Sequence, residues 1–205
     1  MVAVDATCSG LQILAGLARD KSTAELVNVV PSNKPSDAYK AVAEKAKEFL
    51  PTYMHRWMNR SVCKRTVMTI PYNATKDSSR KYIREALLEE GIDPTKDELT
   101  QVVNAVYNSM DTIVPGPMQV MRWIKKHVGQ YIRNGATEVE WVTPSGFVVN
   151  QRRDDIETER MELQLLGRTQ VRLPTGKTTP SPTKHKSSTA PNYIHSFDAS
   201  ILHRS

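Results

Sequence analysis

The stretch that decides the fold is residues 61–75, "SVCKRTVMTIPYNAT", in which two cations stand among apolar residues and a Pro71-Tyr72 pair follows. Proline cannot continue a helix, because it lacks a backbone N–H and restricts the conformation of the residue before it. The sequence therefore predicts a helix from about Arg56 to Thr69 that is broken at Pro71 and leaves Tyr72 just beyond its end.

This predicted helix is basic and carries no acid. Between Tyr53 and Lys76 there is no Asp or Glu, and the cations of the stretch are Arg56, Arg60, Lys64, Arg65 and Lys76. Arg60 and Lys64 are four residues apart, so they share one face of the helix and repel each other. An anion lying across that face would offset the repulsion, and phosphate is the obvious anion. A solvated basic face is the alternative.

Composition limits the function classes without choosing among them. The chain has 205 residues, a net charge of +6 and 39 % apolar residues, which suits one or two ordinary domains and favours polyanionic partners. The two cysteines, Cys8 and Cys63, form no CxxC motif and no Cys/His cluster, so no zinc site is expected; reduced thiols are favoured over one disulfide. No apolar run approaches the roughly 20 residues of a membrane span, and no signal-peptide layout is present, so a cytoplasmic protein is expected.

Helical periodicity extends outward from the opening stretch in both directions. Upstream, Val2 to Val4 is a short strand that ends at Asp5 and leads into a helix with a leucine stripe. The other expected helices are one capped by Ser36 and ended by Pro51, one capped by Asp77 or Ser78 and stopped at Gly91, and two at Asp97–Met110 and Met118–Arg133, separated by "PGP".

The periodicity changes after Gly135. "EVEWVTPSGFVVNQ" alternates on both sides of a Pro-Ser-Gly turn, which predicts a β-hairpin, and "MELQLLGRTQVRL" predicts another strand or a strand pair. "PTGKTTPSPTKHKSST" is expected to be a polar loop, and "YIHSFDASILH" a helix. The fold class is therefore α+β and predominantly helical.

Two further features could carry chemistry. Asp5 follows a strand and precedes small residues, so it could hold Mg²⁺ for phosphoryl transfer, or it could merely cap the next helix. No acid occurs between Glu162 and Asp198, a segment whose cations are Arg168, Arg172, Lys177, Lys184 and Lys186. This segment could follow a nucleic-acid backbone or enter a groove, or it could be a disordered linker.

Four blocks together resemble one known family. "DATCSGLQ" resembles motif A of the phage-type and mitochondrial single-subunit DNA-directed RNA polymerases, and "RSVCKRTVMTIPY" resembles their motif B. "EWVTPSGF" and "APNYIHSFDAS" match further blocks of that family in the same order. The resemblance covers essentially the whole chain and implies the fingers and part of the palm of a right-hand polymerase, with a β-hairpin specificity loop.

The resemblance also implies roles for particular residues. Asp5 would be the first catalytic carboxylate and bind Mg²⁺ with help from the Ala6 carbonyl. Lys64 would contact the nucleotide phosphates and serve as general acid to pyrophosphate, and Arg60 would bind the triphosphate. Tyr72 and His195 would select ribose over deoxyribose. The five cations of the loop from about residue 168 to residue 188 would meet promoter DNA.

The same resemblance implies the domain organisation and the partners. Residues 1–20 would be palm with motif A, residues 21–135 the helical fingers with motif B, and residues 136–205 a β-hairpin, the specificity loop and a return to the palm. The partners would be DNA template and promoter, nascent RNA and ribonucleoside triphosphates, with a monomeric parent enzyme and no membrane.

The chain departs from the family pattern at two places. The residue after the motif B tyrosine is usually Gly but is Asn73 here, and Asn tolerates the left-handed backbone that such a turn requires. The family's second magnesium carboxylate lies in a His-Asp motif beyond Ser205, and Asp198 is not that residue. The chain is thus expected to be an internal piece of a polymerase that is inactive alone.

Two alternatives from other classes remain open. One is a related right-hand DNA polymerase, which shares the spacing of Arg60 and Lys64, although its motif A normally carries a Glu that excludes ribose and that "DATCSGLQ" lacks. The other is a non-catalytic basic module that binds nucleic acid, which salt-dependent binding without nucleotide or metal specificity would favour.

Overall fold

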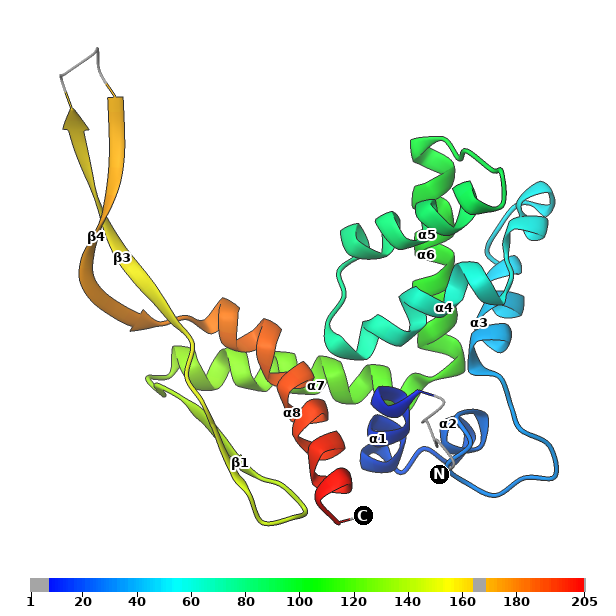
Figure 1. Cartoon of the computed structure of the whole chain (residues 1–205), viewed down its shortest axis with the longest axis horizontal. Helices are drawn as coiled ribbons and strands as arrows, with labels where there is room; N and C mark the ends of the chain where they lie inside the picture. Colours follow the sequence, from blue (N-terminus) through cyan, green and yellow to red (C-terminus); the bar gives the residue numbers. More distant parts are fainter. Residues whose placement is uncertain (1–7, 164–168, 205) are drawn as a thin grey trace.

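The computed structural model describes residues 8–163 and 169–204. The helical body comes first in the chain, and the strands come late (Figure 1). In order, the elements are α1 Ser9–Ala18, α2 Lys21–Leu26, α3 Ala38–Lys47, η1 Thr52–Trp57, α4 Arg60–Thr69, η2 Ile70–Tyr72, α5 Lys76–Glu89, α6 Lys96–Ile113, α7 Pro115–Arg133, β1 Val139–Val142, β2 Val148–Gln151, β3 Asp154–Leu163, β4 Thr169–Pro180 and α8 Pro182–Arg204. The prediction of a predominantly helical chain with β-hairpins is confirmed, whereas the predicted strand at Val2 to Val4 lies outside the described residues.

The opening helix is shorter than its sequence predicts. The backbone is extended at Asn59, whose side-chain oxygen accepts a hydrogen bond from the backbone N–H of Val62 and so caps α4. The residues before it form the separate 3₁₀ helix η1, which ends at Trp57. The predicted start at Arg56 is therefore wrong, because an N-cap interrupts the helical periodicity.

Other helix starts differ from the predictions for the same reason. Asp37 rather than Ser36 caps α3, and Thr75 rather than Asp77 or Ser78 caps α5. The "PGP" segment does not separate two helices but forms the first turn of α7, since proline is tolerated where the first N–H needs no helical partner.

The apolar core lies among the helices of the body. Leu11 and Leu14 of α1 are fully buried, as are Val67 of α4, Leu87 of α5 and Val106 of α6. Cys8 and Cys63 are buried free thiols, as predicted, and burial raises the pKa of Cys63 to about 12, so this thiol is inert at neutral pH.

Asp20 joins two helices within this body. Its carboxylate caps α2 by accepting hydrogen bonds from Thr23 and Ser22, and it also accepts one from the backbone N–H of Gly116 at 3.0 Å. Partial burial raises the pKa of Asp20, but these hydrogen bonds outweigh it and lower the pKa to about 2. The carboxylate therefore ties the start of α7 to α2.

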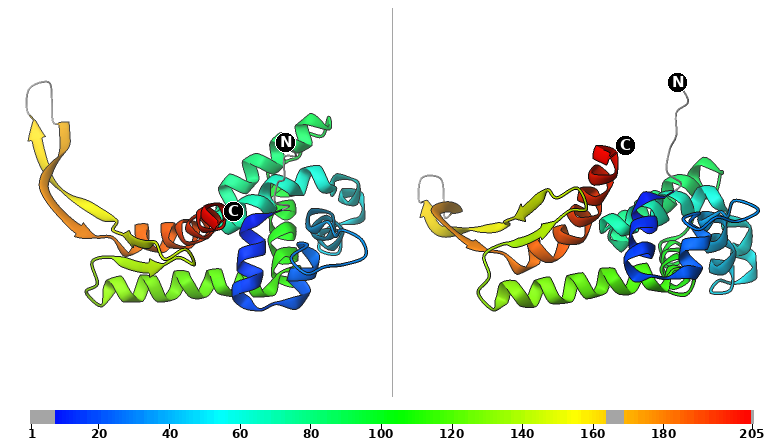
Figure 2. Two further views of the ribbon diagram at one scale, coloured as in Figure 1. Left: turned by 60° about the horizontal axis from the view of Figure 1, so that its bottom comes forward. Right: turned by 90° about the horizontal axis from the view of Figure 1, so that it is seen from below.

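Two antiparallel hairpins complete the chain. The first is as predicted: β1 pairs with β2 around a turn in which Gly146 has a φ of 85°. In the second, β3 pairs with β4, and the hairpin projects away from the helices in every view (Figures 1 and 2). Helix α8 follows β4 and packs along α7. Within the described residues, no helix is long and apolar enough to cross a membrane.

Candidate nucleotide site

Four side chains from three distant segments meet at the end of α4. The Tyr72 ring stacks on the imidazole of His195 in α8, with ring centroids 4.7 Å apart and an interplanar angle of 17°. The Tyr72 hydroxyl lies 3.1 Å from the hydroxyl of Ser9, and an Asp198 carboxylate oxygen lies 3.4 Å from the Ser9 oxygen and 3.5 Å from the Tyr72 oxygen. The structure thus brings together the predicted pair, Tyr72 and His195, with two residues that were not predicted.

Local structure explains how Tyr72 reaches this position. Helix α4 ends in the 3₁₀ turn η2, whose Ile70 and Pro71 are buried while Tyr72 is half-buried. Gly10 of α1 packs directly against this turn, and a Cβ at Gly10 would lie 2.9 Å from Pro71 Cβ and 3.2 Å from Tyr72 Cζ. The absence of a side chain at Gly10 therefore sets the distance between α1 and the tyrosine.

The protonation state of the tyrosine suits hydrogen bonding. Burial is the main cause that raises the pKa of Tyr72; the Ser9 hydrogen bond lowers it by less than burial raises it, and nearby Asp198 raises it further. The phenol is therefore protonated at neutral pH and can donate a hydrogen bond. His195 is exposed, so the stacked pair has one open side.

Asn73, which stands where Gly is usual after the motif B tyrosine, adopts the left-handed turn that this position requires. Its backbone is left-handed, with φ 66° and ψ 30°, as expected for the residue that replaces the usual Gly. Its side-chain amide donates a 2.9 Å hydrogen bond to the backbone carbonyl of Ser187 in α8. Pro191, four residues after Ser187, lacks the N–H that this carbonyl would ordinarily receive in a helix. Asn73 therefore supplies a donor that the helix itself lacks.

A pocket of about 280 Å³ opens beside His195. Arg152, Arg153 and Asn192 contribute to its walls, and an ion pair of 2.9 Å holds Arg152 against Asp154. Two arginines therefore line the same opening as His195.

The cations of α4 are not all unpaired, contrary to the picture of an acid-free face. Arg60 forms an ion pair of 2.7 Å with Asp37 and lies over the ring of Tyr39. The acid comes from another element of the fold, which an acid-free stretch of sequence does not reveal. The pair is half-exposed, and such pairs contribute at most about 1 kcal/mol, so Arg60 can exchange its partner for a ligand anion.

Lys64 is the exception on this helix. Arg65 pairs with Glu85 at 2.8 Å and lies over the ring of Tyr82, whereas Lys64 is exposed and forms no hydrogen bond or ion pair with any residue that the structure describes. Among the cations Arg60, Lys64 and Arg65, it is therefore the lysine that has a free charge.

The predicted basic loop is divided between two elements. Arg172 and Lys177 lie exposed on β4, and Arg168 lies outside the described residues. Lys184 and Lys186 lie on α8, so the loop prediction is wrong for them: β4 continues to Pro180 by pairing with β3, and α8 begins two residues later at Pro182.

The hairpin is also not a basic surface. Strand β3 runs beside the cations of β4 and carries five acids, although the residue directly opposite Arg172 is Arg160; the acids are Asp154, Asp155, Glu157, Glu159 and Glu162. Lys184 at the start of α8 pairs with Asp155 at 2.9 Å. The acid-free segment is therefore paired in space with an acidic one.

The described residues do not by themselves form a magnesium site. Asp5 and Ala6 lie outside them, and no group of three or more His, Cys, Asp or Glu side chains within residues 8–163 and 169–204 is arranged to hold a metal ion. Asp198, the carboxylate nearest Tyr72, already contacts the Ser9 and Tyr72 hydroxyls. The sequence did not predict that Asp198 and Ser9 belong to this cluster, because each is a single polar residue in a helical segment. The small residues around Gly10 were the available signal that another segment approaches closely there.

Comparison with known proteins identifies the family of the chain. A sequence model of the DNA-dependent RNA polymerase family matches residues 1–205. The chain is 29 % identical to the mitochondrial DNA-directed RNA polymerase of Mus musculus over 97 % of its own length and 17 % of that protein. It is 27 % identical to T7 RNA polymerase of Escherichia phage T7 over 99 % of its length and 29 % of that protein, so it spans less than a third of these relatives. The chain belongs to the family of phage-type, single-subunit DNA-directed RNA polymerases.

Proposed function

We propose that this chain is the nucleotide-selecting part of a longer polymerase that carries out template-directed ribonucleotidyl transfer in transcription. The observation that carries the proposal is the cluster of Ser9, Tyr72, His195 and Asp198, in which parts of three family motifs meet around one protonated phenol. In this proposal residues 1–20 and 136–205 contribute to the palm and the specificity hairpin, and residues 21–135 form the fingers.

Tyr72 and His195 would recognise the sugar of the incoming nucleotide. A site built to hydrogen-bond a substrate hydroxyl discriminates strongly against the analogue that lacks it, because its own polar group is then left unpaired. The Tyr72 hydroxyl is held by Ser9, and the open side of the stack leaves room for a ligand. These features suit selection of ribose through its 2′-hydroxyl.

Lys64 and Arg60 would receive the triphosphate. Lys64 has an exposed charge that no described residue neutralises, and a cation placed where negative charge develops stabilises the transition state and can protonate the departing pyrophosphate. Arg60 would exchange its surface ion pair for a phosphate. Mg²⁺, when bound by Asp5 and the Ala6 carbonyl, would neutralise the phosphates; this assignment rests on the motif resemblance.

The hairpin of β3 and β4 would read promoter DNA in a groove. It projects from the body, so it can reach a duplex that the body does not contact (Figure 2). Because its acids offset its cations, contacts to base edges from Arg172 and Lys177 would carry the recognition, rather than general attraction to phosphate. The remaining partners in this proposal are the DNA template and the nascent RNA.

The test is the substitution Tyr72→Phe in the complete polymerase. Incorporation of ribo- and deoxyribonucleotides opposite the same template base is compared in the parent and the variant. The preference for ribonucleotides is expected to fall by at least about tenfold, while ribonucleotide incorporation itself stays within a few-fold of the parent. An unchanged preference would contradict the role of Tyr72. The isolated 205 residues are expected not to extend a primer, and template-dependent synthesis by them would contradict their proposed dependence on the rest of the enzyme.

A further inference from the structure

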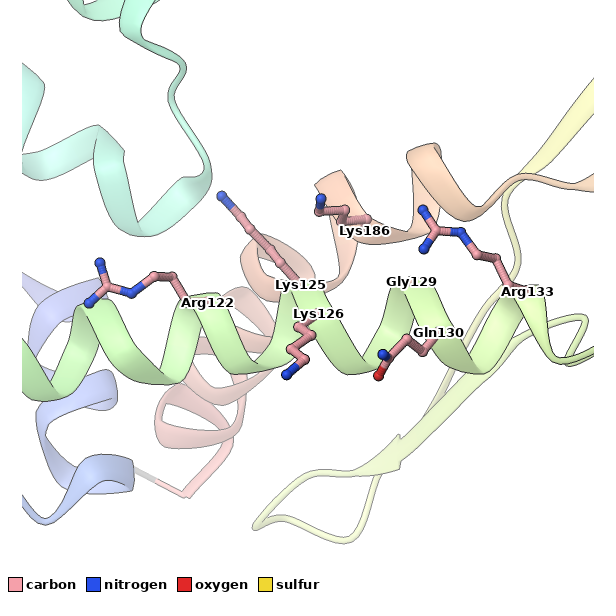
Figure 3. Close-up of a pocket in the computed structure, with 7 residues that line it drawn as sticks. All are labelled: Arg122, Lys125, Lys126, Gly129, Gln130, Arg133 and Lys186. Atoms are coloured by element: carbon pink, nitrogen blue, oxygen red, sulfur yellow. The ribbon is translucent and has the colours of Figure 1, made fainter.

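We infer that a second site, the α7–α8 groove, binds the phosphodiester backbone of a nucleic-acid strand beside the nucleotide site. We define the groove by its cations, Arg122, Lys125, Lys126, Arg133 and Lys186. It is a pocket of about 350 Å³ on the surface of α7, with α8 forming one border (Figure 3). The choice of nucleic acid as the ligand rests on the proposed function.

The cations of α7 recur at helical intervals. Arg122, Lys126 and Arg133 stand at intervals of four and seven residues, which return to the same side of a helix with 3.6 residues per turn. In Figure 3, Lys125 and Arg133 point to the side of α7 on which Lys186 lies, whereas Lys126 points to the opposite side. Gly129 lies between them, and its lack of a side chain leaves the floor open.

The groove lacks the acids that neutralise the other basic surfaces. Helix α7 contains no Asp or Glu, and α8 contains none before Asp198. Arg122 pairs with Asp111 at 2.6 Å, whereas Lys125, Lys126, Arg133 and Lys186 form no ion pair with any described residue. The hairpin, by contrast, carries more acids than cations. The surface suited to a polyanion is therefore the groove.

Lys125 and Lys186 bring two positive charges together in the groove. Lys125 is half-buried between the two helices, and burial lowers the pKa of its ammonium group, with the positive charge of nearby Lys186 lowering it further. Two lysines that face each other without an acid repel, and a phosphate between them would reverse the sign of that interaction.

The dimensions of the groove suit a strand rather than a single ion. From Arg122 to Arg133 the helix rises about 16 Å, at about 1.5 Å per residue. One strand of a duplex places a phosphate about every 3.4 Å along its axis, so the row can meet several successive phosphates. Lys186 lies on the same helix as His195, about 14 Å away along the axis. A strand in the groove would therefore lie a few nucleotides from the nucleotide site.

The test measures how oligonucleotide binding to the complete polymerase depends on salt. Lys125→Gln with Lys186→Gln removes two charges from the groove, and Lys81→Gln with Lys96→Gln removes two exposed charges from α5 and α6 as a matched control. Affinities are measured by fluorescence anisotropy at several salt concentrations without nucleotides, for a single DNA strand, the RNA of the same sequence and the DNA duplex.

The groove double variant should reduce the magnitude of the salt slope by about 1.4 for a single strand or about 1.8 for a duplex, since each phosphate contact contributes about 0.7 or 0.9. The control should leave it unchanged. The probe that shows the reduction identifies the strand that the groove holds. If no probe shows a reduction of the slope, the inference is overturned. That result is expected if an acidic segment of the protein, rather than a nucleic acid, covers the groove.

A second variant and a second readout keep the test decisive. If the half-buried Lys125 is needed for folding, the exposed pair Lys126→Gln and Arg133→Gln should give the same reduction in slope, and an unchanged slope in this variant overturns the inference. Nucleotide incorporation separates the two proposals. If the groove variant has a reduced slope but the parent enzyme incorporates no ribonucleotide, the groove is supported and the proposed function is contradicted. If the parent incorporates ribonucleotides normally but the variant has an unchanged slope, the proposed function is supported and the groove is contradicted.

Discussion

Gly10→Ala tests whether close approach of α1 to the η2 turn positions Tyr72. The added Cβ would lie 2.9 Å from Pro71 Cβ and 3.2 Å from the Cζ and hydroxyl oxygen of Tyr72, so the turn or the helix must shift. Gly16→Ala is a matched control in the same helix, because a Cβ at Gly16 meets nothing within 4 Å. The two variants differ only in what the new methyl group meets.

Both variants gain helix propensity, and Gly10→Ala also introduces a steric overlap. Replacing Gly by Ala inside a helix stabilises it by about 0.8–1.0 kcal/mol, and forcing a methyl group into a packed site costs about 1–3 kcal/mol. Gly16→Ala should therefore stabilise α1 by about 1 kcal/mol, whereas Gly10→Ala should be neutral or destabilise it by up to about 2 kcal/mol. The expected difference between the variants is about 1–3 kcal/mol.

Hydrogen exchange on the complete protein measures this difference as the free energy of local opening at α1 and η2. Nucleotide incorporation gives the functional result: Gly10→Ala should lower the preference for ribonucleotides, because it moves the Tyr72 hydroxyl away from Ser9. Gly16→Ala should leave the preference unchanged. Equal opening free energies in the two variants, together with an unaltered preference, would refute the idea that Gly10 sets the position of the tyrosine.

Three further predictions concern the cations of α4, the helix cap Asp20 and the hairpin. Lys64→Ala should slow the chemical step by about 10²–10³-fold in single-turnover kinetics, while Arg65→Ala, which loses a surface ion pair and the contact with the Tyr82 ring, should leave the rate near that of the parent. The pKa of Asp20 in the folded state is about 2 and below its unfolded value, so its extra stability is present above pH 4 and lost as the pH falls toward 2. Asp20→Asn should therefore lower the free energy of unfolding, measured in urea, by about 1–2 kcal/mol at pH 7 and by less at pH 3; the figure is discounted for the partial exposure of Asp20. A loss of stability that does not change with pH would contradict this. Replacing residues 158–174 with a short turn should abolish promoter-dependent initiation but spare primer extension, whereas retained promoter selectivity would remove the hairpin from DNA reading.

The sequence predicts the types of the elements better than their ends. The first hairpin, a strand or strand pair within the second, and the long helices were predicted because period-2 and period-3.6 patterns extend over many residues. Helix starts were missed by one to four residues because they depend on which side chain reaches a backbone N–H, as at Asn59 and Asp37. The largest error was the predicted loop before α8, where prolines and threonines suggested irregular structure although pairing with β3 continues β4 to Pro180.

For the candidate site, the sequence predicts single residues but not their neighbours. Tyr72 and His195 were predicted, and the structure stacks them. The ion pair of Arg60 with Asp37 was not foreseen, because acids that are absent from a stretch of sequence can be supplied from another element. The α7–α8 groove was missed for the converse reason: its cations belong to two helices whose sequences are far apart, and each alone resembles an ordinary solvated face.

The hydrogen bond from Asn73 to the Ser187 carbonyl makes two distant positions interdependent. Asn73→Gly would suit the left-handed turn yet leave that carbonyl without a donor, because the proline at position 191 cannot supply one. Pro191→Ala would restore the donor within α8 and make the amide redundant. The two substitutions should therefore be non-additive, with the double variant less impaired than the sum of the single ones. Which residue is tolerated after the tyrosine thus depends on the residue at position 191, and sequences that exchange one would be expected to compensate at the other.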